Sequence, residues 1–426
     1  MNVIYLCLRA LKEIIDDKRS VQAVLNDFNN EYNLSLQDKA LLSKTLRGSI
    51  RHFFLLSYQA GELFPSFESD DDEIYLLIPC LYQLRYLKKD IAAFQVIDEL
   101  LKVNDDLLLR LDPNETKEKL TSFSSSKFKL SKEIMQDYYK CLSFMFSTPE
   151  WVVKLYAKEY GDDMMLNVLK SKSNHVLNYL RVNTSKVFFD EIAALDTYHP
   201  IEEVGGAVTY SGKENVSKSL EYQHGKIFSC DLSWQILIDE FSDVSYKTKC
   251  LQIGEINGGL SSGIAVYLKG QEGNLDVSFE TEISYRHAKY QYQRLGLDNI
   301  KAYMADLDML RTYLPYSSYD VVFVTPKSSF LGQLSKRPSI ALTITSNELK
   351  KITKKEMAYL EEGAKYLLPS GVLVYACESI LKEEGSKIVS SFLKRHKDYV
   401  LAKEKTIFPY EYNSYGMYYA ILEKEE

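Results

Sequence analysis

A glycine-dense turn is the part of this 426-residue sequence whose residue types and spacing best suit chemistry. The turn follows the apolar segment Leu251–Ile253 and contains Gly254, Gly258, Gly259 and Gly263. Glycine accepts positive φ and lets the backbone approach a ligand closely, so such a turn after a strand is typical of nucleotide-like ligand sites in doubly wound folds. The spacing is neither G-x-G-x-x-G nor G-x-x-x-x-G-K, which disfavours a dinucleotide site and a phosphate-binding loop.

Two acidic residues follow the glycine-dense turn at the ends of later strand-like segments. Glu280 ends the second such segment, where a carboxylate can hydrogen-bond ribose hydroxyls, and Asp306 ends the third, where a carboxylate can reach an adenine amino group. The order of turn, first acid and second acid suits S-adenosylmethionine. A Rossmann-like sheet that binds nothing there explains the same pattern equally well, and the residues alone leave both readings open.

The elements that must position these residues belong to the last of three expected domains. Residues 1–145 have helical periodicity, and residues 146–230 mix an amphipathic helix with short strands. Residues 231–426 alternate strand-like and helical segments, which predicts βαβ units, right-handed crossovers and a mostly parallel sheet. We therefore expect an α/β Rossmann-like domain preceded by an all-α domain and a small α+β subdomain.

Within the α/β domain, apolar strands and amphipathic helices can be read from the pattern. Tyr319–Val324 and Gly371–Ala376 are short apolar runs with flanking turns, and Tyr418–Leu422 is expected to be the last strand. Ser346–Leu367 and Ile380–Lys397 have helical periodicity.

Composition and net charge exclude several classes of protein. The chain is 46% hydrophobic and 26% charged with a net charge of −7, values that exclude wholesale disorder, a collagen-like chain and a small disulfide scaffold. An acidic balance argues against nucleic-acid binding through bulk charge, so an anionic partner must meet a local basic patch. The six cysteines are widely spaced and no Cys/His cluster has ligand spacing, so we expect reduced thiols and no metal.

No segment of the sequence has the pattern of a membrane anchor or a secretion signal. Uncharged runs stay below the ~18–20 residues that cross a bilayer. The first fifteen residues are apolar but carry Arg9, Lys12 and Glu13, unlike a signal peptide. We therefore expect a cytoplasmic protein without membrane contact, and the sequence leaves its oligomeric state open.

Several short motifs, which occur in a fixed order over nearly the whole chain, resemble the Sun or RsmB-like family of rRNA and tRNA cytosine-C5 methyltransferases. They are Asp38-Lys-Ala-Leu41, Gly48-Ser-Ile-Arg51 and Leu81-Tyr-Gln-Leu84 in the helical part, Pro149-Glu-Trp151, Leu180-Arg-Val-Asn-Thr184, Asp231-Leu-Ser233 with Gln235, Arg294-Leu-Gly296, Gly371-Val-Leu-Val-Tyr-Ala376 and Tyr415-Gly-Met-Tyr-Tyr-Ala-Ile-Leu422. Each is weak alone, but the ordered set is specific. The resemblance implies a NusB-like RNA-binding domain at residues 1–145 and an S-adenosylmethionine methyltransferase domain at residues 231–426.

Departures from the family pattern concern the residues that do chemistry. In the cofactor turn the twin glycines remain, but Asn257 replaces a proline and Leu260 replaces the lysine that pairs with the cofactor carboxylate. Of the two cysteine positions, one holds Lys327 and the other holds Glu378, while Cys377 stands one residue early. C5 methylation needs a thiolate that attacks C6. Cys377 is therefore the one candidate nucleophile, although a small buried apolar role suits it better.

Contacts to RNA must come from local features. Arg47 and Arg51 are four residues apart and share one helix face, and basic residues recur near positions 88, 129 and 336. By resemblance, Arg181 and Asn183 are the candidates for RNA contacts in the middle domain. Tyrosines near these basic residues can stack on unpaired bases. Because the net charge is −7, salt-driven RNA binding should be weak.

Three hypotheses follow from the sequence. The first is a catalytically degenerate member of the family that binds RNA and retains a weakened S-adenosylmethionine site. The second is an active methyltransferase with a relocated nucleophile or a different target atom. The third is a protein-interaction module without an RNA role.

Overall fold

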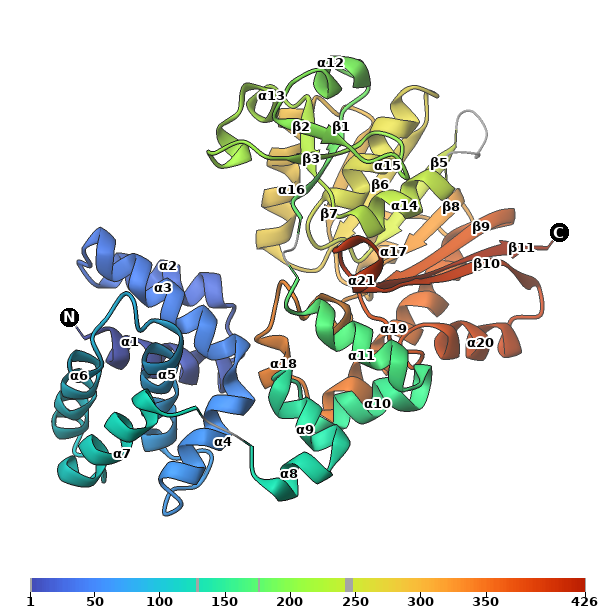
Figure 1. Ribbon diagram of the computed structural model, residues 1–426. Helices are drawn as coiled ribbons and strands as arrows, with labels where there is room; N and C mark the ends of the chain where they lie inside the picture. Colours follow the sequence, from blue (N-terminus) through green and yellow to red (C-terminus); the bar gives the residue numbers. More distant parts are fainter. Residues whose placement is uncertain (1, 128–129, 175–176, 242–247, 426) are drawn as a thin grey trace. The chain divides into compact units, whose positions relative to one another are not determined.

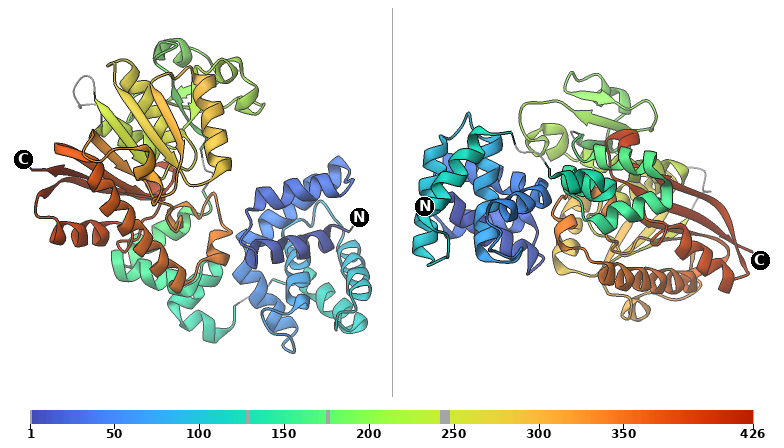
Figure 2. Two further views of the ribbon diagram at one scale, coloured as in Figure 1. Left: turned by 180° about the vertical axis from the view of Figure 1, so that it is seen from behind. Right: turned by 60° about the horizontal axis from the view of Figure 1, so that its bottom comes forward.

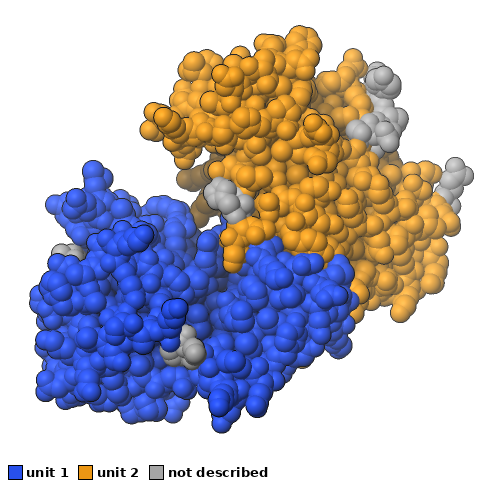
Figure 3. Space-filling view, in the orientation of Figure 1, with its two compact units in different colours: residues 1–172, 336–344 blue, residues 173–335, 345–426 orange. Residues whose placement is uncertain are grey.

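The computed structural model describes residues 2–127, 130–174, 177–241 and 248–425 (Figure 1). The chain forms two compact units, coloured separately in Figure 3: residues 1–172 with 336–344, and residues 173–335 with 345–426. Each unit has a hydrophobic core of its own, so each is described separately.

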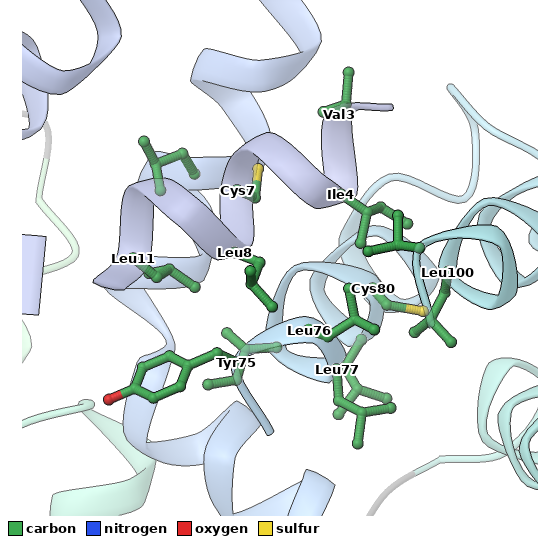
Figure 4. Packing of buried hydrophobic residues seen from close by; sticks show 14 of the residues in the cluster. Val3, Ile4, Cys7, Leu8, Leu11, Tyr75, Leu76, Leu77, Cys80 and Leu100 are labelled. Carbon is green, nitrogen blue, oxygen red and sulfur yellow. The ribbon is translucent and has the colours of Figure 1, made fainter. Parts of the chain in front are cut away.

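Unit 1 is helical. Its elements are α1 (Val3–Ile15), α2 (Val21–Glu31), α3 (Leu36–Arg51), α4 (Phe53–Leu63), α5 (Asp72–Tyr86), α6 (Ala93–Asp106), α7 (Pro113–Ser125), α8 (Lys132–Gln136), α9 (Tyr138–Met145), α10 (Glu150–Tyr160), α11 (Asp162–Ser171) and α18 (Ile340–Thr343). Apolar side chains at helical spacing on α1 and α5 meet in the core shown in Figure 4, where Cys7 and Cys80 are both fully buried. All six cysteines of the chain are free thiols.

The expected middle domain, 146–230, is divided between the two units after Lys172. The physical reason lies in what each half packs against. The buried Lys172 ammonium donates to the carbonyls of Phe146 and Ser147, at 2.6 and 2.8 Å, and thereby fastens the end of α11 to the end of α9. The strands that follow pack instead on the α/β domain.

Unit 2 contains two sheets. The small antiparallel sheet has the order β2-β3-β1-β4, with β1 (Tyr179–Val182), β2 (Tyr198–Pro200), β3 (Ala207–Tyr210) and β4 (Ile227–Ser229); α12 (Phe189–Ala193), η1 (Val216–Lys218) and α13 (Leu220–Gln223) lie in its connections. Tyr179, Ala207 and Phe228 of this sheet join the apolar cluster of the larger sheet and its helices. The small sheet is therefore an extension of the α/β domain.

The large sheet has the order β10-β11-β9-β8-β5-β6-β7. Its strands are β5 (Lys249–Ile253), β6 (Asn274–Phe279), β7 (Ile300–Met304), β8 (Tyr319–Val324), β9 (Leu367–Cys377), β10 (Tyr399–Ile407) and β11 (Met417–Lys424). The five strands β5 to β9 are parallel to their neighbours in that group, and β11 is antiparallel to both β9 and β10. The predicted mostly parallel α/β sheet is confirmed.

Helices cover both faces of the large sheet, as the two views of Figure 2 show. One face carries α14 (Leu232–Glu240), α15 (Gly259–Lys269) and α16 (Glu282–Leu295); the other carries α19 (Ser346–Tyr366) and α20 (Ser386–Arg395), and the short elements α17 (Leu310–Tyr313), η2 (Leu331–Gln333) and α21 (Pro409–Tyr412) lie in loops. The strand order reverses beside β5, between β6 and β8. A crevice at the carboxyl ends of the strands beside such a reversal is where doubly wound folds bind ligands.

Candidate cofactor and catalytic site

The glycine-dense turn lies at this reversal point, between β5 and α15. Gly254 has φ +91°, and a Cβ there would stand 2.7 Å from the carbonyl oxygen of Thr325. Gly258 has φ +76° and is the left-handed residue that begins α15. Both positions therefore require glycine. Gly259 follows as the first residue of the helix, so all three predicted glycines lie in one backbone cradle.

Glu255, which the sequence did not single out, lies inside this turn and is nearly buried. Its carboxylate accepts hydrogen bonds from the backbone N–H groups of Ile256, Asn257 and Ser261, at 2.7, 2.9 and 3.1 Å. The amide Nε2 of Gln252 donates a fourth, at 3.0 Å. The Ser261 N–H belongs to the first turn of α15, so the protein supplies its own anion to the helix N-terminus. The only signal in the sequence was an acid directly after the first glycine.

Glu280 lies just beyond β6, where the sequence placed it, and is held by a lysine from another element. The Lys355 ammonium of α19 lies 2.8 and 3.0 Å from its two carboxylate oxygens. The same ammonium is 5.5 Å from the ring centroid of Tyr359, and a Cβ on Gly254 would be 3.2 Å from a ring carbon of Tyr359. A chain of contacts therefore links the glycine turn to the carboxylate through Tyr359 and Lys355 of α19.

Asp306 follows β7 and is exposed. Its carboxylate accepts the backbone N–H of Met309 at 2.9 Å, which leaves further acceptor positions on the carboxylate. Leu260 is 2% exposed and packs in the apolar cluster formed with α14 and α16. It therefore faces the core and supplies neither a charge nor a contact to a ligand at the turn.

These residues fit one half of S-adenosylmethionine better than the other. The two strand-end carboxylates, Glu280 and Asp306, suit the ribose and the adenine of an adenosine. The amino-acid half carries a carboxylate, which needs N–H donors or a cation. The donors of the turn already bind Glu255.

The two positions that the resemblance matches to the family's cysteines, Lys327 and Glu378, lie beyond β8 and β9. Lys327 is exposed at the end of β8. Glu378 is 4% exposed, and its carboxylate accepts a hydrogen bond from the Trp234 indole at 3.0 Å. Cys377 is 1% exposed, its thiol donates to the carbonyl of Glu384 at 3.4 Å, and burial raises its pKa well above the ordinary value. A thiol in this setting stays protonated and is a poor nucleophile.

A buried carboxylate ties the loops after β8 and β9 together, and sequence reasoning missed it. Glu384 accepts from the Ser329 N–H, the Ser329 hydroxyl and the Ser379 hydroxyl, each at 2.6 Å. Glu356 of α19 is fully buried beside it, and burial followed by the charge of Glu384 raises the pKa of Glu356 well above the ordinary value. Burial raises the pKa of Glu384 as well, so the neighbouring carboxyls favour keeping a proton on Glu356.

The two residues predicted to contact RNA in the middle domain are engaged inside unit 2. Asn183 is fully buried, and its amide donates to the carbonyls of Gly225 and Leu295, at 2.9 and 3.0 Å. Arg181 forms an ion pair with Asp239 at 3.0 Å, and its side chain is 13% exposed. In this structure the Asn183 side chain is not available to an RNA, because its polar groups bind the protein itself.

The two arginines predicted in unit 1 are exposed on α3, beside a column of aromatic rings. His52 stacks on Tyr86 with centroids 4.5 Å apart and planes 14° apart, and Tyr86 stacks on Tyr82 at 5.0 Å and 25°. Burial, with the charge of Arg51, lowers the pKa of His52 to about 4 and keeps its ring neutral. Arg47 donates to the side chain of Gln22 at 2.7 Å.

Neither a metal site nor a membrane span emerges from the part of the chain that the structure describes. Within residues 2–127, 130–174, 177–241 and 248–425, no three His, Cys, Asp or Glu side chains gather as metal ligands. No helix in the same ranges is long and apolar enough to cross a membrane.

A family model matches part of the α/β domain, and curated relatives match most of the chain. The family model described as 16S rRNA methyltransferase RsmB/F matches residues 281–423. A relative from Bacillus subtilis, named probable ribosomal RNA small subunit methyltransferase B, is 23% identical over 406 residues, which cover 92% of this chain and 88% of the relative.

Solved structures share the fold over most of the chain. The crystal structure of PH0851 superposes with a TM-score of 0.78 at 19% identity and covers 99% of this chain and 98% of its own. A methyltransferase homologue from Pyrococcus horikoshii has a TM-score of 0.58 at 16% identity, over 69% of this chain and 100% of its own.

Proposed function

Because the chain belongs to the Sun/RsmB-like family of RNA methyltransferases, we propose that it binds RNA and a nucleoside cofactor but does not methylate cytosine at C5. The observation that carries this proposal is the chemistry at the two cysteine positions. Neither the Lys327 amine nor the Glu378 carboxylate can attack C6 of a cytosine in the way that a thiolate does. Glu378 is moreover bound to the Trp234 indole.

The remaining thiol near these positions is no substitute. Cys377 belongs to β9 itself, is 1% exposed, and has a pKa raised by burial. Attack on a base requires a thiolate at the end of the strand, within reach of the RNA. Bringing Cys377 there needs a one-residue slip of β9, which turns every side chain of the strand to the opposite face.

S-adenosylmethionine supplies an activated methyl group when it is bound. In this chain, we propose, the backbone at Gly254, Gly258 and Gly259 cradles the nucleoside, while Glu280 accepts from ribose hydroxyls and Asp306 accepts from the adenine amino group. Glu280 shares its carboxylate between Lys355 and the ribose, so the affinity is expected to be weakened. Support comes from the strand reversal beside β5, which places all these groups at one edge of the sheet.

For the RNA, we propose the face of unit 1 formed by Arg47, Arg51 and the rings of His52, Tyr82 and Tyr86. Tyr86 stacks on both His52 and Tyr82 and is still 44% exposed, and we propose that its exposed part takes an unpaired base. Aromatic stacking on bases is sequence-tolerant, and the arginines supply charge for the phosphates. Such a local basic site is consistent with an acidic chain of net charge −7.

A methyl-transfer assay tests the enzymatic half of this proposal. The full chain is incubated with tritiated S-adenosylmethionine and a 16S rRNA transcript, beside the variant Cys377→Ala. We expect no incorporation at cytosine C5 from either protein. Incorporation at C5 by the wild type that is lost in Cys377→Ala would refute the proposal. Incorporation at another atom would favour the alternative of an active enzyme with a different target.

Fluorescence anisotropy with a labelled unstructured RNA tests the binding half. Stacking on an aromatic side chain contributes about 1–3 kcal/mol per base, so Tyr86→Leu should weaken binding by roughly 5- to 150-fold. Tyr86→Phe keeps the ring and should bind like the wild type. Tyr138→Leu, at a tyrosine of unit 1 that is 47% exposed, is the matched control. Equal affinities for Tyr86→Leu and Tyr138→Leu would rule out this face as the RNA site.

A further inference from the structure

Three backbone N–H groups of the glycine-dense turn bind a carboxylate of the protein itself. A carboxylate offers about four lone-pair positions, and Glu255 receives four donors: three backbone N–H groups and the Gln252 amide. Backbone N–H groups at the start of a helix are the usual seat for an anionic ligand group. Here the Ser261 N–H at the start of α15 and two N–H groups of the turn already bind the negative charge of Glu255.

From this geometry we infer that the site takes an uncharged 5′-thioadenosine nucleoside in preference to a thioadenosine that carries an amino-acid tail. The inference rests on the proposed nucleoside site and names its ligand class. A second carboxylate at the turn meets like charge on Glu255 and finds no unoccupied donor among the three N–H groups that Glu255 binds. The nucleoside half meets no such conflict at Glu280 and Asp306.

Two lysines on the same edge of the sheet bear on this preference. The Lys355 ammonium bridges both oxygens of Glu280, so its charge is balanced by that carboxylate. Lys327 lies after β8 and is exposed. On α15 itself, the position that carries a lysine in the family pattern holds the buried Leu260.

Isothermal titration of the full chain with two probes tests the inference. 5′-Methylthioadenosine and S-adenosylhomocysteine share the adenosine and the thioether, and they differ in the amino-acid tail. We expect methylthioadenosine to bind more tightly than S-adenosylhomocysteine. Equal or tighter binding of S-adenosylhomocysteine overturns the inference and leaves the proposed nucleoside site standing. Binding of neither probe removes the nucleoside site itself.

Variants separate the role of Glu255 from that of Lys355. Glu255→Ala frees three N–H donors and should raise the affinity for S-adenosylhomocysteine relative to methylthioadenosine by about tenfold, a change that corresponds to 1.4 kcal/mol. An unchanged ratio in a folded Glu255→Ala protein overturns the inference. Lys355→Met should change both affinities alike, and a selective loss of S-adenosylhomocysteine binding would assign the tail to Lys355 instead. The wild-type comparison decides the question if Glu255→Ala does not fold.

Discussion

The buried carboxyl pair of Glu356 and Glu384 predicts an unusual dependence of stability on pH. Glu356 is fully buried and its pKa is raised well above the ordinary value by burial and by the neighbouring charge. In the unfolded chain its pKa returns to about 4.3. Between these two values the folded protein holds a proton that the unfolded protein has released, so the free energy of unfolding falls as the pH rises.

The size of the effect follows from proton linkage. One proton held only in the folded state lowers the free energy of unfolding by about 1.4 kcal/mol for each pH unit. Glu356→Gln has nearly the same shape, but it cannot ionise. The variant should therefore be close to the wild type in stability near pH 5 and gain on it by about 1.4 kcal/mol per unit above the ordinary glutamate range.

Urea unfolding at pH 5, 6, 7 and 8 measures this difference. The chain has two tryptophans, Trp151 in unit 1 and Trp234 in unit 2, so a Trp151→Phe background makes the fluorescence report on unit 2 alone. Glu282→Gln, on the exposed surface of α16, is the matched control and should follow the wild type at every pH. A stability difference between Glu356→Gln and the wild type that stays constant with pH would refute a buried, protonated Glu356.

Three further substitutions test other parts of the structure in the same unfolding assay. Asn183→Ala removes two hydrogen bonds to buried carbonyls and should cost about 2–3 kcal/mol while RNA affinity stays unchanged; a loss of RNA affinity in folded protein would restore a direct contact. Glu384→Ala leaves three donors without an acceptor and should cost at least ~3 kcal/mol, and a near-neutral effect would contradict the buried cluster. A Cβ on Gly332 would stand 2.0 Å from the carbonyl oxygen of Gly416, so Gly332→Ala should cost about 3 kcal/mol. Gly270→Ala, where the nearest atom is 3.6 Å away, is its control, and equal stabilities would show that the close approach at Gly332 is absent.

The sequence predicted buried strands better than edge strands, for a physical reason. Tyr319–Val324 was predicted with the bounds that β8 has, because a strand covered on both faces is a continuous apolar run. Tyr399–Ile407, the edge strand β10, was missed between the predicted helix and last strand. It is exposed over most of its length and carries Lys403, Glu404 and Lys405, a composition typical of protected edges and also of loops.

Among the site residues, positions at strand ends could be predicted from the sequence, whereas their partners from distant elements could not. Glu280 and Asp306 stand at strand ends because parallel strands present their carboxyl ends at one edge, so their placement could be predicted from the order of strands. Their partners could not be predicted, since Lys355 is 75 residues from Glu280, and Ser329 is 55 residues from Glu384. Contacts at such separations depend on the packing of α19 and of the loops, which no local pattern encodes.

The motifs that carry the family resemblance turn out to include hydrogen-bonding residues of the scaffold. The Gln235 amide donates to the carbonyls of Leu180 and Cys230, at 3.2 and 2.8 Å, and the Asp231 carboxylate accepts the Tyr415 N–H at 3.1 Å. Asn183 likewise binds only protein groups through its amide nitrogen. From the sequence alone, a polar residue that hydrogen-bonds buried backbone groups looks the same as one that binds a ligand, because both are polar residues within apolar strands. Gln235, Asp231 and Asn183 match the family pattern and bind the framework, whereas Leu260, Lys327 and Glu378 depart from that pattern. The proposed loss of C5 chemistry on a retained fold predicts such a partition.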